Sequence, residues 1–324
     1  MSIVYVKEQG SAIRKRAGRM VVMKDSEILL EIPLRDTTSV AVFGNVQVTT
    51  QAMSEFLDSG IALSLFTRNG RLKGHLTPEA SKNMPLRIKQ YECALDPVRA
   101  LKLAKAVVRA KLKNSAALVA DYRAHYPGPA LEEAARGLST AAQQAEKAEA
   151  LDQLRGFEGA AAAAHFRAFA VMNRSEFPFP GRRRRPTPDP INALLSFGYT
   201  LLTNELRGLL EGAGFEPLLG FLHQVEYGRP SLALDLVEPF RSQIDRLTLR
   251  LVNERMLTAK DFATHVSGPR AGSVVLMPDS IGKYLGEFET FLESRGIRRA
   301  MGDEVEALGR AVRDGVEFVA WGGE

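Results

Sequence analysis

The N-terminal part of the chain alternates short apolar runs with turn residues, a pattern that predicts β-strands. The runs are rich in β-branched side chains, and Gly, Pro, Asp or Ser residues bound most of them. The predicted strands cover residues 3–6, 20–23, 28–32, 39–43, 61–66 and 71–76. Asn69-Gly70 is a strong hairpin signal before the last strand, and a short helix is expected from Thr49 or Thr50 to Asp58.

From about Pro97 onward, the apolar positions recur at helical spacing instead. Helices are predicted over about 97–118, 130–150, 148–172, 190–210, 279–294 and 303–318. A shorter helix is expected over 217–227, where it carries His223. Another begins at Ser231 and is interrupted or kinked at Pro239.

These two patterns together predict an α+β fold. A small β-sandwich-like domain covers residues 1–85, a linker covers 86–96, and a larger all-α domain covers 97–324. The β-rich domain contains no catalytic constellation, so we interpret it as a scaffold or dimerisation module. The basic segment Arg14-Lys15-Arg16 within it is expected to form a solvated edge.

The composition excludes several classes of protein but does not identify a function. The 324 residues include 43 Lys and Arg against 38 Asp and Glu, and the net charge of +5 permits a polyanionic partner without requiring one. Cys93 is the only cysteine, which excludes an internal disulfide and any cysteine-cluster metal site. No apolar run approaches the roughly 20 residues that span a bilayer, and the N-terminus lacks the order of a signal peptide. We therefore expect a soluble protein of a reducing compartment with no membrane partner.

The segment 177–190 breaks the helical pattern. It contains five prolines and four consecutive arginines, Arg182 to Arg185, so it is predicted to be a loop. From composition alone, the loop is either simply solvated or in contact with phosphate groups.

A few acidic residues and one histidine stand in unusually apolar surroundings. They are Glu158, His223, Asp235 and Glu238, and the last two are three residues apart on one helical face. Because a lone buried charge is costly, such residues could share a divalent metal, and the imidazole favours manganese over magnesium. The alternative is a hydrogen-bonded core histidine with acids paired to arginines, for which Arg155, Arg229 and Arg241 are the candidates.

Four segments resemble those of a known family. Residues 188–202, PDPINALLSFGYTLL, resemble the signature helix of the CRISPR-associated endonuclease and integrase of spacer acquisition, the "Cas-one" family. Residues 232–241, LALDLVEPFR, are similar to its acidic metal segment. GNVQVTT at 44–50 and GIAL at 60–63 resemble its N-terminal domain. The resemblance covers nearly the whole chain, and the order of the domains matches.

The resemblance implies a site for Mn²⁺ or Mg²⁺ formed by Glu158, His223 and Glu238, which would be the catalytic residues. Asp235 would be a nearby acid or an alternative ligand. DNA would be bound by Arg182, Arg183, Arg184, Arg185, Arg229 and Arg241. The family often has a proline after the arginine of the EPFR segment, whereas Ser242 follows here, which affects the turn more than the metal.

The function implied by the resemblance is the insertion of captured foreign DNA fragments into a CRISPR array as new spacers. The 3′-hydroxyl of the fragment would attack a phosphodiester at the edge of a repeat. The implied partners are a second copy of the chain, bound through the β-rich domain, and the small protein "Cas-two", in the cytoplasm of a prokaryote. Two alternatives stay open: a general metal-dependent nuclease acting on branched DNA, and a DNA-binding assembly subunit without catalysis.

Overall fold

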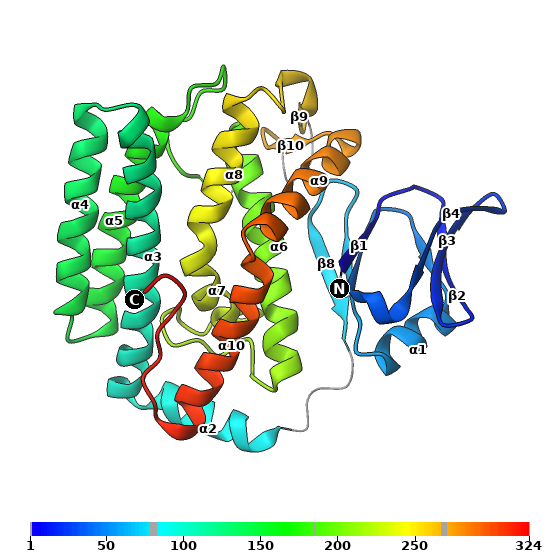
Figure 1. Ribbon diagram of the computed structural model, residues 1–324, viewed down its shortest axis with the longest axis horizontal. Helices are drawn as coiled ribbons and strands as arrows, with labels where there is room; N and C mark the ends of the chain where they lie inside the picture. The colour runs from blue at the N-terminus through cyan, green and yellow to red at the C-terminus, as the bar shows by residue number, and fades with distance from the viewer. Residues whose placement is uncertain (1, 78–82, 184–185, 267–270, 324) are drawn as a thin grey trace. The chain divides into compact units, whose positions relative to one another are not determined.

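The computed structural model describes residues 2–77, 83–183, 186–266 and 271–323 (Figure 1). The chain divides into two compact units. Unit 1 comprises residues 1–80 and 275–287, and unit 2 comprises residues 81–274 and 288–324. Strands dominate unit 1 and helices dominate unit 2, so the predicted α+β fold is confirmed.

Unit 1 is built from two four-stranded sheets. The first has the order β1 (Ser2–Val6), β5 (Thr37–Phe43), β7 (Ala62–Phe66) and β8 (Leu72–Leu76). The second has the order β4 (Glu27–Pro33), β3 (Arg19–Lys24), β2 (Ala12–Arg16) and β6 (Gln47–Val48). In the first sheet, β5 pairs in parallel with β1 and β7, and β8 pairs antiparallel with β7. In the second, β3 pairs antiparallel with β2 and β4, and β6 pairs in parallel with β2. The short turn η1 (Leu34–Asp36) and helix α1 (Thr50–Asp58) complete the unit, and Thr49 caps α1.

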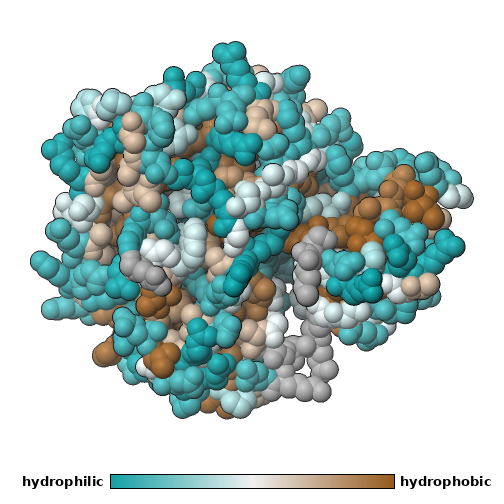
Figure 2. Space-filling model, viewed as in Figure 1, coloured by the Kyte–Doolittle hydropathy of each residue, from teal (hydrophilic) through white to brown (hydrophobic). Residues whose placement is uncertain are grey.

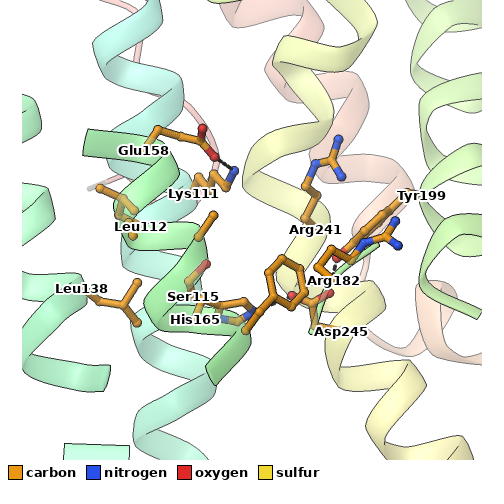
Figure 3. Close-up of a pocket in the computed structure, with 13 residues that line it drawn as sticks. Lys111, Leu112, Ser115, Leu138, Glu158, His165, Arg182, Tyr199, Arg241 and Asp245 are labelled. Atoms are coloured by element: carbon orange, nitrogen blue, oxygen red, sulfur yellow. Dashed lines mark hydrogen bonds and ion pairs between the residues drawn. The ribbon is translucent and has the colours of Figure 1, made fainter. Parts of the chain in front are cut away.

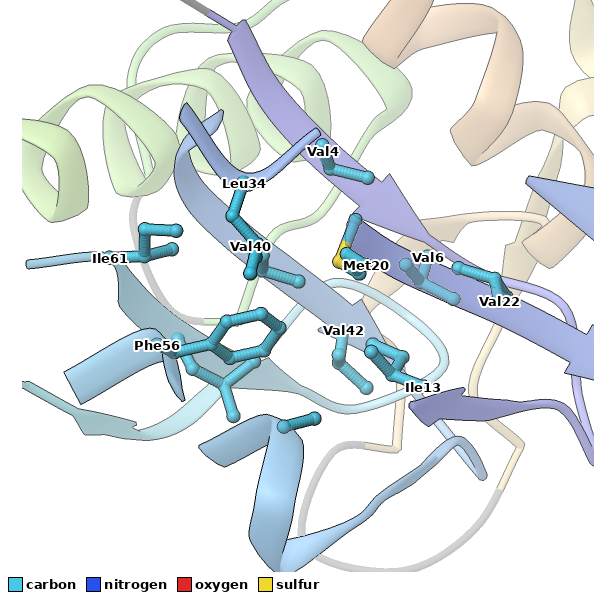
Figure 4. Close-up of a cluster of buried hydrophobic side chains, with 12 residues drawn as sticks. Val4, Val6, Ile13, Met20, Val22, Leu34, Val40, Val42, Phe56 and Ile61 are labelled. Carbon is cyan, nitrogen blue, oxygen red and sulfur yellow. The ribbon is translucent and has the colours of Figure 1, made fainter. Parts of the chain in front are cut away.

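A single apolar cluster fills the space between the two sheets and α1 (Figure 4). Val40 of β5, Ile13 of β2 and Phe56 of α1 each expose 1% of their surface or less. Because side chains alternate along a strand, Val40 and Val42 both face this cluster. The sandwich-like arrangement predicted from the sequence is therefore present.

Strand β2 contains the basic segment that was expected as a solvated edge. Its three basic residues are exposed, but Ile13 beside them is fully buried, and β2 pairs with both β3 and β6. A single apolar position is too weak a signal to indicate a strand.

Unit 2 is a helical assembly. Its helices are α2 (Met84–Leu95), α3 (Pro97–His125), α4 (Pro129–Glu146), α5 (Leu151–Met172), α6 (Pro190–Ala213), α7 (Ser231–Val237), η2 (Glu238–Phe240), α8 (Arg241–Asn253), η3 (Ala259–Asp261), the C-terminal part of α9 (Pro278–Ser294) and α10 (Ile297–Asp314). Strand β9 (Phe262–Thr264) also belongs to unit 2, and β10 (Val274–Leu276) begins at residue 274, where the first segment of the unit ends. Asp96 and Asp189 cap α3 and α6, and each is followed by a proline at the first helical position.

Two segments of unit 2 differ from the prediction. Residues 86–96, expected as a linker, form most of α2, and Gln90 fixes this helix by donating hydrogen bonds to the carbonyls of Glu216 and Leu219. Residues 217–227, expected as a short helix carrying His223, form an irregular loop. The apolar spacing there was misleading, because a buried carboxylate from α7 takes the amide hydrogens that a helix would use. None of the helices in the described ranges is long and apolar enough to cross a membrane.

Candidate active site

The centre of the candidate site is a lysine that lies between two glutamates. Nζ of Lys111, on α3, is 2.6 Å from Oε2 of Glu238 in η2, and the same ammonium forms an ion pair with Glu158 on α5 (Figure 3). Only 3% of the Glu238 side chain is exposed, against 24% for Glu158. Two of the predicted acids, far apart in the sequence, therefore meet at one cation.

Pro239 shapes the segment that carries Glu238. Proline has no amide hydrogen, so the hydrogen-bond ladder of α7 cannot continue through it. The chain forms the 3-10 turn η2 before α8 begins, and this turn keeps Asp235 and Glu238 buried on either side of the junction.

Asp235 organises the loop that contains His223. One carboxylate oxygen, Oδ2, accepts hydrogen bonds from the amides of Phe221 (2.6 Å) and Leu222 (2.9 Å). The other, Oδ1, accepts from the amide of His223 (2.9 Å) and lies 2.7 Å from its Nδ1. At Gly220, a Cβ atom would lie 2.7 Å from Oδ2, so only glycine fits there without a shift. A single buried carboxylate thus replaces the hydrogen bonds of the predicted helix.

The same contact orients the imidazole of His223. Because an ionised carboxylate only accepts hydrogen bonds, Nδ1 of His223 donates to Asp235, and Nε2 is the ring nitrogen that this contact leaves free. Nε2 lies 3.9 Å from Oε1 of Glu238. The free nitrogen therefore faces the buried acid, with Asp235 behind the ring.

The charges around Glu238 determine its protonation state. Burial alone would raise the pKa of its carboxyl, but Arg241, Lys111 and His223 outweigh burial and lower the pKa to about 2. Nε of Arg241 lies 2.9 Å from Oε1 of Glu238. Burial likewise opposes the charge on Lys111, but Glu238 and Glu158 raise its pKa. Glu238 and Lys111 are therefore both charged at neutral pH.

A second group of buried polar residues lies next to the group formed by Lys111, Glu158 and Glu238. Asp245 of α8 accepts a hydrogen bond from the hydroxyl of Tyr199 on α6, and its Oδ2 lies 2.7 Å from Nε2 of His165 on α5. Burial and the neighbouring Asp245 raise the pKa of Tyr199 well above its usual value. Arg241 and Arg182 lie 4.5 Å and 5.5 Å from the centre of the Tyr199 ring. Tyr199 is thus a protonated residue of the core.

A small cavity of about 60 Å³ joins the two groups, and Lys111, Glu158, His165, Tyr199 and Arg241 line it (Figure 3). Neither Lys111 nor Asp245 is among the site residues predicted from the sequence. A signal for Lys111 existed, since it lies three and four residues after the buried Val108 and Val107, on the apolar face of its helix.

The predicted DNA-binding arginines differ in exposure and in their hydrogen-bond partners. Arg182 donates hydrogen bonds to Oδ1 of Asn192 (2.8 Å) and to the hydroxyl of Ser196 (3.1 Å), which holds the start of the arginine loop against α6. Arg183 is exposed, and Arg184 and Arg185 lie outside the described residues.

Three arginines are candidate ion-pair partners of the buried acids, and each of them contacts a different group. Arg229 forms an ion pair with Glu226, and Arg241 pairs with Glu238. Arg155 donates from Nε to the carbonyl of Leu222 at 2.8 Å, so it supports the His223 loop instead of neutralising a buried acid. The alternative of an acid paired with an arginine therefore applies to Glu238.

The donor set suits a divalent metal, although the side chains do not surround one. Among the described residues, no group of three or more His, Cys, Asp or Glu lies in a metal-holding arrangement. The ammonium of Lys111 stands between Glu158 and Glu238 instead. Oε2 of Glu238 is buried against Nζ of Lys111, and two carboxylates with one imidazole nitrogen are ligands that Mn²⁺ and Mg²⁺ accept. The residues therefore fit such an ion if the lysine shifts.

Sequence comparison relates the chain to known proteins. The sequence model of the family described as CRISPR associated protein Cas1 matches residues 4–290. The protein named CRISPR-associated endonuclease Cas1 3, from Thermus thermophilus, is 37% identical over 298 residues, which cover 91% of this chain and 86% of that protein.

Two solved structures share the fold. A casposase bound to integration product superposes with a TM-score of 0.86 at 21% identity, covering 99% of this chain and 93% of that chain. A chain of the Cas6-RT-Cas1–Cas2 complex gives a TM-score of 0.85 at 22% identity. There the match covers 99% of this chain and 36% of that chain.

Proposed function

The chain belongs to the Cas1 family of CRISPR-associated proteins, and we propose that it is a metal-dependent DNA integrase that inserts captured fragments into a CRISPR array. The observation that carries the proposal is that Glu158 and Glu238 meet at one cation, Lys111, while Nε2 of His223 lies 3.9 Å from Oε1 of Glu238. The similarity to a casposase bound to integration product supports strand transfer over simple hydrolysis.

In this proposal, Glu158, Glu238 and Nε2 of His223 would hold Mn²⁺ or Mg²⁺. Such an ion stabilises negative charge on a phosphoryl oxygen and acidifies a hydroxyl. Asp235 would not be a ligand, because hydrogen bonds from three amides and from Nδ1 of His223 occupy both of its oxygens. Its role would be to fix the ring of His223.

The reaction exchanges one phosphodiester bond for another. The 3′-hydroxyl oxygen of the captured fragment forms a bond to phosphorus, and the bond from phosphorus to the 3′-oxygen of the target strand breaks. The attacking hydroxyl loses a proton, and the departing 3′-oxygen gains one. Lys111 and Arg241, both charged and beside Glu238, would stabilise the charge that develops on the phosphoryl oxygens. Water in place of the 3′-hydroxyl would give plain nuclease activity.

DNA and protein partners complete the proposal. Arg182 to Arg185, Arg229 and Arg241 would contact the DNA backbone, and the similarity to a chain of a Cas1–Cas2 complex supports Cas2 as a partner. Unit 1 would form a homodimer through β4, whose Ile28, Leu29 and Leu30 expose 37–43% of their surface. Figure 2 shows apolar side chains gathered over this unit.

An integration assay with Mn²⁺ tests the function. The substrates are a duplex with free 3′-hydroxyls and a plasmid that carries a CRISPR repeat, with and without Cas2. We expect joined products from the wild type and a loss of about 10²-fold or more in Glu238→Gln, which keeps the size of the side chain but removes its charge. Glu133→Gln, which changes an exposed acid of α4, serves as the control and should retain activity.

The products also separate the alternatives. Cleaved fragments without joining would favour a general nuclease. DNA binding without any change in the substrates would favour an assembly subunit. Wild-type activity in Glu238→Gln would refute the site.

A further inference from the structure

A second, larger cavity in unit 2 is lined by an unusual number of arginines. It measures about 770 Å³ and lies where the C-terminal ends of α3, α5, α8 and α9 come together. Five arginines line this arginine cavity: Arg174, Arg246, Arg250, Arg255 and Arg295. Figure 1 shows α3, α5 and α8 running alongside one another toward the same side of the unit.

The positive charge of the arginine cavity exceeds the acidic charge beside it. Among the described residues, the acids that line it are Asp121 and Glu254, which contact Arg246 and Arg250. Within the described part of the chain, the guanidinium groups of Arg174, Arg255 and Arg295 contact no carboxylate, and all three residues are exposed. Five guanidinium groups against two carboxylates leave an excess of three positive charges.

Aromatic rings hold two of these unpaired arginines. The guanidinium of Arg174 lies 4.1 Å from the centre of the Tyr126 ring, and that of Arg295 lies 4.9 Å from the centre of Phe291. Burial, together with the charge of the neighbouring Arg246, lowers the pKa of Arg295. Ring contacts thus support Arg174 and Arg295, although Arg246 repels the charge on Arg295.

The partial charges at the helix ends offer another explanation for why arginines gather in this cavity. The C-terminal end of a helix carries a partial negative charge of about half an electron, which favours nearby cations. This effect explains why arginines are stable at the ends of α3, α5, α8 and α9. It does not account for an open cavity with three guanidinium groups directed to solvent, since the effect decays within the last helical turn.

We propose that the arginine cavity binds the phosphodiester backbone of DNA at a distance from the candidate active site. Guanidinium groups donate paired hydrogen bonds that match phosphate oxygens, and several of them in one concave surface suit a chain of phosphates. This inference rests on the proposed function in that it takes DNA as the substrate, and it adds a second contact that would orient the strand.

The two sites face different sides of the same helices. On α8, Asp245 joins Tyr199 and His165, whereas the next residue, Arg246, turns to Asp121. On α3, eleven residues separate Lys111 from Tyr122 of the arginine cavity, which is roughly 16 Å along the helix axis. A strand held at both places would be fixed in direction as well as in position.

The test measures DNA binding without metal and without catalysis. A triple variant, Arg174→Gln, Arg255→Gln and Arg295→Gln, is titrated with a fluorescent duplex in EDTA at several KCl concentrations. The control triple variant, Arg136→Gln, Arg299→Gln and Arg310→Gln, removes the same charge from exposed positions outside the cavity. We expect the cavity variant to bind at least about tenfold more weakly than the control. The slope of log affinity against log salt concentration should become shallower by about 0.9 for each phosphate that the variant no longer neutralises.

Two results would overturn the proposal. One is a cavity variant with the same affinity and salt slope as the control variant. The other is a lower melting temperature with an unchanged salt slope, which would mean that the arginines only stabilise helix ends. Glu238→Gln changes the candidate active site and leaves the arginine cavity intact. Its activity therefore tests the proposed function separately from the arginine cavity.

Discussion

Glu304 on α10 is a carboxylic acid that the fold holds in its neutral form. The residue exposes only 4% of its surface, and one of its oxygens, Oε1, has no hydrogen-bond partner in the described part of the chain. Burial raises the pKa of Glu304 to about 8. The amide of Trp321, which donates a hydrogen bond to Oε2 at 3.2 Å, lowers the pKa by a smaller amount. Trp321 in turn stacks on Phe240 of η2, with ring centres 4.8 Å apart. Glu304 thus lies under the C-terminal segment that covers η2.

This raised pKa predicts that stability falls as the pH rises. Between the unfolded pKa of 4.5 and the folded pKa of about 8, the folded state binds more protons than the unfolded state, so the free energy of unfolding decreases with pH. Relative to Glu304→Gln, which cannot ionise, the wild type should lose about 3 kcal/mol between pH 5.5 and pH 8. Urea unfolding at the two pH values measures this loss.

The control for this prediction is Glu306→Gln, which removes an exposed acid two residues away. Its difference from the wild type should be nearly the same at both pH values. If the Glu304→Gln difference is equally independent of pH, the carboxyl is ionised throughout and the proposed burial effect is wrong.

At the scale of an element, the loop around His223 shows where sequence patterns fail. Apolar residues near helical spacing suggested a helix over 217–227, because periodicity does not reveal a competing hydrogen-bond acceptor. Asp235 lies far enough along the chain that its four contacts with residues 221–223 follow only from the tertiary structure. The acids and the histidine themselves were identifiable, because charged residues in apolar segments require partners.

The loop depends on the charge of Asp235, so Asp235→Asn should weaken metal binding. An asparagine amide would direct a donor at backbone amides or at Nδ1 of His223, leaving at least one of these donors unpaired. We expect a loss of about 10- to 100-fold in Mn²⁺ affinity, as for other residues that orient a metal-binding histidine. Isothermal titration calorimetry of the folded protein measures this affinity.

Asp303→Asn, at a position where 71% of the side chain is exposed, is the matched control and should bind Mn²⁺ like the wild type. Equal affinity in Asp235→Asn would mean that the carboxylate does not position His223 for the metal. A folded Asp235→Asn protein, checked by circular dichroism, keeps the comparison valid.

At the scale of the whole molecule, the fold class was predictable because the two halves differ in hydrophobic period. Short apolar runs identified β3, β4, β5 and β7, whereas β2 escaped notice, since its Arg14-Lys15-Arg16 segment is solvated and one buried residue, Ile13, carries the packing. The ion pairs of Lys111 were also beyond reach, because they join α3, α5 and η2. Such contacts depend on how helices pack, which a period in the sequence does not specify.

The exposed strand β4 leads to a prediction about assembly. Neighbouring residues of a strand point to opposite faces, yet Ile28, Leu29 and Leu30 all expose more than a third of their surface. β4 is the outermost strand of its sheet, and an uncovered apolar edge favours pairing with another chain. Ile28→Lys with Leu30→Lys should therefore weaken the proposed homodimer by about 3 kcal/mol, or about 100-fold in Kd.

Sedimentation velocity over a range of concentrations measures this change. The control adds two lysines to α1 and its C-terminal end instead, as Gln51→Lys with Ser59→Lys, both at exposed positions of the same unit. Because both variants gain the same charge, general electrostatic repulsion affects them equally. A difference between their dimer dissociation constants therefore reports contact through β4. A wild type that is monomeric at every concentration, or a β4 variant that dimerises as tightly as the control, would rule out this strand as the interface.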